Sequence, residues 1–169
     1  MKKLILAAVI CMTYTNVQAN VCEIPLNQVA VGSMTLMQSL DQFKKIHSNA
    51  KPDKDRIQIL DVDQAFENAG VTSVGSIDFD PVKNRIIGFT LSYNEGKYAQ
   101  LETPLNQFKN SILKNSKLPQ KGWVLSQDKE AYQYRCNDYQ VFIRQDHGVG
   151  RGSLGAVVWV FSRYSDSFE

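Results

Sequence analysis

This chain lacks an excess of basic residues. It contains 19 Lys and Arg against 17 Asp and Glu, and two of the basic residues are Lys2 and Lys3. Beyond those two, the formal charge is zero, with 17 residues of each sign. Proteins that bind nucleic acid or an anionic membrane normally carry a basic surplus, because it releases counterions. We therefore expect neither nucleic acid nor a lipid surface as a partner.

The apolar run near the start is too short to cross a membrane. It covers residues 4–12, follows Lys2 and Lys3, and precedes Val17-Gln18-Ala19. A membrane-spanning helix needs about 20 apolar residues, whereas a charged start, a short apolar run and a small-x-small site form a secretory signal. The pattern predicts a signal peptide over residues 1–19, cleavage after Ala19 and a mature chain without a membrane anchor. Such a signal serves both periplasmic and secreted proteins.

Cysteine is scarce, and its scarcity makes the pairing simple. Of the three cysteines, Cys11 lies in the predicted signal, which leaves Cys22 and Cys136. Two cysteines in an exported domain typically form a disulfide. There is no Cys-x-x-Cys motif, so a structural bridge is favoured over a redox-active pair. We predict that Cys22–Cys136 fixes the mature N-terminus to a strand.

Motifs for catalysis, nucleotides and metals are absent or out of context. Gly150, Gly152 and Gly155 have the spacing of a dinucleotide fingerprint, but they lead into an apolar strand rather than a helix. The two histidines, His47 and His147, have no ligand spacing. We expect His47 to end a helix, where the helix dipole favours its cationic form. No cofactor or metal is predicted, and enzymatic activity stays open, with a non-enzymatic role favoured.

Periodicity predicts an α+β fold, with a mostly antiparallel sheet and two main helices packed on one face. The first helix is expected over residues 36–47, with Thr35 and Gln38 as a capping box, and the second from Pro104 after an N-cap at Thr103. Residues 24–31 look extended. Other strands are expected over 56–62, 71–79, 85–93, 122–127, 131–136, 139–145 and 154–162. The last strand is apolar on both faces, which predicts cover on both, and the tail 163–169 is expected to fray.

Residues 40–46, LDQFKKI, resemble residues 105–112, LNQFKNSI. The echo is open to two interpretations. Two similar helix-plus-strands lobes, about 20–95 and 96–169, would produce it by duplication. Ordinary amphipathic helices in a single domain, 20–169, would produce it too, and this interpretation is favoured. The arrangement also resembles, in layout and without a shared motif, small exported α+β modules such as β-lactamase inhibitor proteins.

The glycine-rich stretch at 144–152 is the predicted contact loop. It contains the candidate partner-binding residues Arg144, Asp146, His147 and Arg151, and loops on a rigid sheet often carry binding residues. The favoured hypothesis is an exported bacterial envelope protein that uses this loop and an exposed sheet face to bind a protein or an envelope ligand. The alternative is a small periplasmic hydrolase with Asp146 and His147 as an acid/base pair. Oligomeric state is not indicated.

Overall fold

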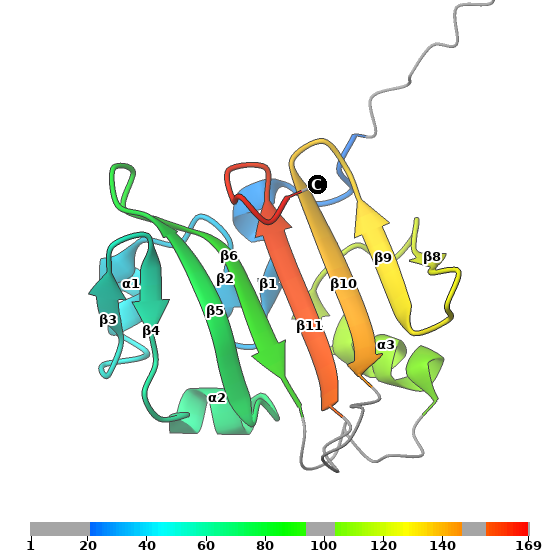
Figure 1. Cartoon of the computed structure of the whole chain (residues 1–169), viewed down its shortest axis with the longest axis horizontal. Helices are drawn as coiled ribbons and strands as arrows, with labels where there is room; N and C mark the ends of the chain where they lie inside the picture. Colours follow the sequence, from blue (N-terminus) through cyan, green and yellow to red (C-terminus); the bar gives the residue numbers. More distant parts are fainter. Residues whose placement is uncertain (1–20, 94–103, 147–154, 169) are drawn as a thin grey trace, which may run out of the picture.

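The computed structural model describes residues 21–93, 104–146 and 155–168 of the chain (Figure 1). In this part, one face of a large antiparallel sheet is turned to the viewer, and α1, α3 and a small sheet lie behind it. The predicted α+β class with a mostly antiparallel sheet is confirmed. The described residues contain no helix long and apolar enough to span a membrane.

The large sheet has eight described strands in the order β3-β4-β5-β6-β11-β10-β9-β8, and each neighbouring pair is antiparallel. The bounds of the first four are Lys51–Asp53, Arg56–Gln58, Ser73–Asp80 and Arg85–Ser92 for β3, β4, β5 and β6. Those of the other four are Val124–Leu125, Ala131–Arg135, Tyr139–Asp146 and Gly155–Ser162 for β8, β9, β10 and β11. The strands predicted over 71–79 and 85–93 are confirmed as β5 and β6, which pair as a hairpin, and the predicted C-terminal strands are confirmed too.

The small sheet has the order β2-β1-β7. Its strands are short, and their bounds are Ala30–Val31 for β1, Met34–Thr35 for β2 and Ser116–Lys117 for β7. The helices are η1 (Leu26–Gln28), α1 (Leu40–Lys44), α2 (Gln64–Asn68) and α3 (Leu105–Lys114). Pro104, predicted in the first helical position, is the N-cap of α3, and the predicted cap Thr103 lies outside the described residues.

The core lies between the large sheet and the helices. Each α-helix contributes one fully buried phenylalanine to it, namely Phe43, Phe66 and Phe108. Directly after β6, Tyr93 meets Phe108 edge to face, with 5.7 Å between the ring centroids. Such aromatic pairs add to the stabilisation that burial of apolar surface already gives. The helices therefore cover one face of the sheet, called the inner face below.

The first helix begins later than its periodicity predicts. The capping box forms at Ser39 and Gln42 rather than at Thr35 and Gln38. The reason is a competing backbone pairing, because Met37 N–H donates to the Ile86 carbonyl and Ile86 N–H donates to the Gln38 carbonyl. That pairing holds residues 37–38 against β6, so the helix starts only after it.

His47 is buried, and the prediction that it ends the first helix is wrong because α1 already ends at Lys44. Its side chain is fully enclosed, between the rings of Phe43 and Phe66 at centroid distances of 4.4 and 4.1 Å. Its Nδ1 lies 2.7 Å from Oδ2 of Asp63. The other carboxylate oxygen of Asp63 accepts two backbone N–H groups at the start of α2. The histidine thus fixes α2 against the end of α1.

The predicted disulfide is present. Cys22 and Cys136 are bonded, with Cα atoms 5.1 Å apart and a sequence separation of 114 residues. Beside it, the Glu23 carboxylate accepts the backbone N–H groups of Gln120 and Lys121. The Glu23 N–H donates to the hydroxyl of Tyr134. The N-terminal segment is therefore attached to β9 and to the chain after α3.

The two parts that share the sequence echo also share an order of elements. In each, a helix is followed by four strands of the large sheet, and the last strands, β6 and β11, pair in its middle. Phe43 and Phe108 hold corresponding positions in the echo, and both are fully buried. Helix α2, between β4 and β5, has no counterpart among the described residues of the second half. This order is compatible with both interpretations of the echo, which stay predictions.

Candidate functional site

The candidate site is the face of the large sheet that the helices leave open, called the outer face. Cross-strand partners share a face, and the register of five strands places one residue from each in a single row. The row, called the central row, consists of Thr90, Trp159, Phe142, Gln133 and Val124, from β6, β11, β10, β9 and β8. Sequence neighbours of these residues, such as Leu91 and Val158, are fully buried on the inner face.

Two aromatic side chains occupy the middle of the central row. Trp159 and Phe142 are half-buried and meet edge to face, with 6.0 Å between ring centroids. The indole N–H of Trp159 donates to no group among the described residues. At the end of the row, Val124 is 66% exposed. A tryptophan with a free N–H beside a second aromatic ring can provide both apolar contact and a directed hydrogen bond.

A polar margin borders the central row on the side where β10 ends. There Val157 of β11 is opposite Arg144 of β10, and Arg144 Nη2 contacts Glu130 Oε2 at 3.1 Å. Both side chains are about one third exposed, so the ion pair adds little to stability. Arg144 Nε is buried and has no hydrogen-bond partner in the described part of the chain. A polar margin beside an aromatic centre is the usual arrangement of a protein interface.

The turn between β8 and β9 adds a fixed negative charge near Val124. The Asp128 carboxylate accepts the hydroxyl of Ser126 and the backbone N–H of Glu130. The hydroxyl hydrogen bond, followed by the backbone one, lowers the pKa of Asp128 below its ordinary value. Asp128 is therefore a carboxylate at neutral pH. It follows β8, the strand that carries Val124, and Thr90 is at the other end of the row.

The opposite margin of the outer face is covered by the C-terminal tail. Ser165 Oγ donates to Asp78 Oδ2 at 2.6 Å, and Gln140 Nε2 donates to the Ser167 carbonyl at 2.8 Å. The tail was expected to fray, and that prediction is wrong because these hydrogen bonds and a ring contact hold it. The contact is between the Arg135 guanidinium and the Phe168 ring, 5.2 Å away.

Gly88 leaves the space that the ring of Phe161 occupies on the outer face. A Cβ atom at Gly88 would lie 2.6 Å from the ring of Phe161, so no larger residue fits beside that ring. Phe161 is consequently buried under the tail. The next outer residues along β11, Trp159 and Val157, are only half-buried. The prediction that β11 is covered on both faces is therefore wrong for the strand as a whole.

The loop residues predicted to bind a partner are only partly described. Arg144 lies at the polar margin of the outer face. The backbone of Asp146 pairs with Gly155 at the ends of β10 and β11, whereas His147 and Arg151 lie outside the described residues. The prediction of an exposed sheet face did not name Phe142 or Trp159. The signal for Trp159 was the apolar character of β11 on both faces.

Three further aromatic residues of this region, Tyr134, Tyr139 and Trp123, belong to the core or pack against it. Tyr134 and Tyr139 are buried, with ring centroids 5.7 Å apart. Burial raises the pKa of Tyr139, so its hydroxyl stays neutral. Trp123 packs against the core and donates its indole N–H to the Pro119 carbonyl at 2.8 Å. The two tryptophans of the chain thus differ in surroundings, and only Trp159 lies on the outer face.

Comparison with known proteins supplies no identity for this chain. No protein-family model, curated protein or solved structure matches it. The layout resemblance to β-lactamase inhibitor proteins therefore gains no support from these comparisons. Within the described ranges, no group of three or more His, Cys, Asp or Glu side chains is placed to hold a metal ion.

Proposed function

We propose that this protein is an exported, non-enzymatic binding module of the bacterial envelope, and that it holds a protein partner on its outer sheet face. The observation that carries the proposal is the Trp159–Phe142 pair in the central row, whose side chains are only partly buried. Tryptophan and arginine are enriched among the residues that dominate binding energy, and Arg144 borders the pair. The disulfide and the signal-like start of the chain support export to the periplasm or the medium.

The hydrolase hypothesis relies on Asp146 and His147, whose side chains lie outside the part of the chain that the structure describes, so it stays a prediction. The described histidine, His47, offers no second acid/base site. A general base must reach the proton that it removes. His47, with Asp63 on its Nδ1, has the pairing of a catalytic dyad, but its Nε2 is buried and contacts no polar partner. The aromatic rings on both sides of the imidazole close it from substrate. This pair therefore has a structural role.

Affinity capture with one altered side chain tests the proposal. Tagged protein is cross-linked in the envelope fraction, and bound proteins are identified by mass spectrometry. We expect a reproducible partner with the wild type and its loss with Thr90→Arg, because a charged side chain in the central row must be desolvated on binding. Asn110→Arg, at an exposed position of α3, adds the same charge on the helix side. It should capture the partner as the wild type does.

Two outcomes of this capture would contradict the proposal. One is a partner that binds the Thr90→Arg variant as well as the wild type. The other is a partner lost with Asn110→Arg and kept with Thr90→Arg, which would place the interface on the helices. Thermal unfolding of both variants shows whether a loss of capture comes from a loss of folding.

A further inference from the structure

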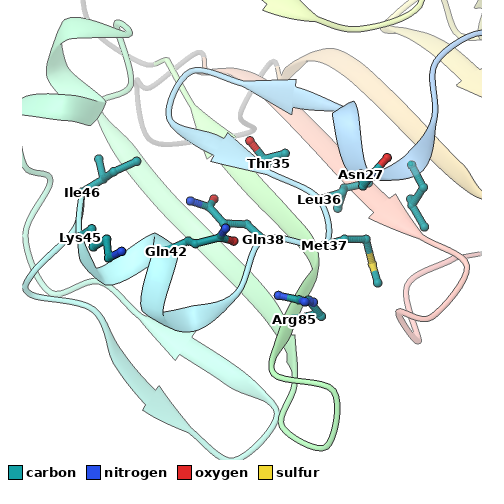
Figure 2. A pocket seen from close by; sticks show the side chains of 10 residues that line it. Asn27, Thr35, Leu36, Met37, Gln38, Gln42, Lys45, Ile46 and Arg85 are labelled. Carbon is teal, nitrogen blue, oxygen red and sulfur yellow. The ribbon is translucent and has the colours of Figure 1, made fainter.

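A second surface feature lies on the helix side of the sheet. It is a groove between η1, the segment that joins β2 to α1, and the start of β6, with a volume of about 870 Å³ (Figure 2). Volumes in this range accommodate small ligands or a short stretch of peptide. Figure 2 shows Gln38 and Gln42 in the middle of the groove, with Arg85 on one side and Lys45 and Ile46 toward one end.

The charge of the groove has one sign. Lys45 and Arg85 line it, and none of the described residues that line it is acidic. Neither cation forms an ion pair within the described part of the chain, whereas Lys83, Arg144 and Arg163 each have a carboxylate partner. Unpaired cations at a concave surface attract an anionic group, and Arg offers two parallel N–H donors to a carboxylate. The groove is therefore complementary to a carboxylate.

The middle of the groove carries side-chain amides. The Oε1 atom of Gln38 is buried and has no hydrogen-bond partner among the described residues. Such an unsatisfied acceptor is costly unless a ligand supplies a donor. The Gln42 Oε1 already accepts the Ser39 N–H, so its amide is held in place. Asn and Gln amides offer both a donor and an acceptor, which match the groups of a peptide backbone.

The backbone beneath these side chains is held in a sparsely populated conformation. Met37, which lines the groove, has a φ of 64°, in the left-handed region that non-glycine residues rarely adopt. Its hydrogen bond to Ile86 fixes this turn against β6. Residues kept in such conformations by their surroundings cluster at ligand sites. The groove is thus formed before any ligand arrives.

Apolar side chains complete the lining. Ile46 is 48% exposed, and Met37 lies on the other side of the two glutamines (Figure 2). Leu26 also lines the groove. Separate apolar positions on both sides of polar amides suit a chain with alternating side chains better than a compact anion. We infer that the groove binds an extended peptide segment that carries an acidic side chain, with its carboxylate on Arg85 and Lys45. This inference does not depend on the outer face.

NMR titration of the isotope-labelled, disulfide-bonded protein tests the inference. The probe is a pool of octapeptides with blocked ends, a central glutamate, and flanks drawn from leucine, serine and glycine. We expect saturable shifts of the Met37, Gln38 and Gln42 amide signals, with a dissociation constant below about 5 mM. A pool with glutamine in place of glutamate should bind at least about fivefold more weakly, because it lacks the charge-assisted hydrogen bonds.

Two variants and a free carboxylate complete the test. Arg85→Gln should weaken binding at least about fivefold, whereas Lys44→Gln, at an exposed position of α1 outside the groove lining, should not. Unchanged signals away from the groove show that Arg85→Gln is folded. The inference is overturned if no saturable shift occurs, if the glutamine pool binds equally, if Lys44→Gln has the same effect, or if hexanoate binds as tightly as the peptides. The titration does not use the Thr90→Arg variant. A failure of the titration can therefore be told apart from a failure of the proposed function.

Discussion

Replacement of both Cys22 and Cys136 by serine should lower the free energy of unfolding by about 4 to 5 kcal/mol. The bond joins residues 114 positions apart, and cross-linking a loop of that length removes much of the entropy of the unfolded chain, although an enthalpic share is debated. Domains of this kind are stable by only about 5–15 kcal/mol. The loss therefore amounts to a large part of the stability.

Urea unfolding followed by circular dichroism measures this loss. The control is the wild type in a reducing agent, which should unfold at the same midpoint as the double serine variant. In the serine variant we also expect weaker hydrogen bonds to the Glu23 carboxylate, because its contacts with the Gln120 and Lys121 N–H groups lie beside the bond. If the serine variant and the oxidised wild type unfold at equal urea concentrations, the bond does not stabilise the fold and this account of it is wrong.

Replacement of Trp159 by alanine should weaken the affinity for the captured partner at least about 30-fold, or about 2 kcal/mol. The side chain is in the middle of the central row and contacts Phe142 on the same face. Residues at the centre of an interface, where water is fully excluded, give the largest losses on truncation. Phe142→Ala should act in the same direction, and the two changes should not be additive because the rings touch.

The other tryptophan provides the matched control. Trp123→Ala removes the same side chain from the inner side, where it packs against the core. It should cost folding stability and leave the affinity of the folded protein unchanged. Isothermal titration with the purified partner, together with thermal unfolding of each variant, separates the two effects. An equal loss of affinity in both variants would show that general destabilisation, and not the outer face, explains the result.

Local sequence patterns predicted the elements that depend on local chemistry. The hairpin of β5 and β6 followed from two strand-like runs around a turn that contains Asp80, Pro81 and Asn84. In the structure, the Asp80 carboxylate accepts the N–H groups of Val82 and Lys83, and Asn84 has positive φ. The disulfide followed from counting, because only two cysteines remain after the predicted signal. In both cases the deciding residues are few and their chemistry is specific.

Features decided by distant residues could not be predicted in this way. The start of α1 depends on Ile86, which is far along the chain, and the environment of His47 depends on Asp63 and Phe66. On β6, Ile87, Phe89 and Leu91 alternate with Gly88 and Thr90, a pattern that by itself places Ile87 on the inner face with the other two. The pairing with β5 shifts between Ile86 and Gly88, so Ile86 is buried instead. One extra residue in a strand reverses the faces that follow it.

The sequence indicated the candidate site only through the unusual apolar pattern of β11. Strand β11 is apolar on both alternating sets, and this pattern alone does not show whether a second layer covers the outer set. The structure shows that the tail covers Phe161 and leaves Trp159 open. The loop residues chosen from composition, apart from Arg144 and the backbone of Asp146, fall outside the described residues. Their part in binding stays a prediction.

Site-specific photo-crosslinking tests the central claim most directly, because it reports contact rather than a change in affinity. A benzophenone side chain is placed at Gln133, in the central row, or at Asn110, on α3, and the exported protein is irradiated in intact envelopes. The account predicts that one protein partner is attached through position 133 and not through position 110. Attachment only through position 110, or none through 133 when the partner is captured by other means, would contradict it.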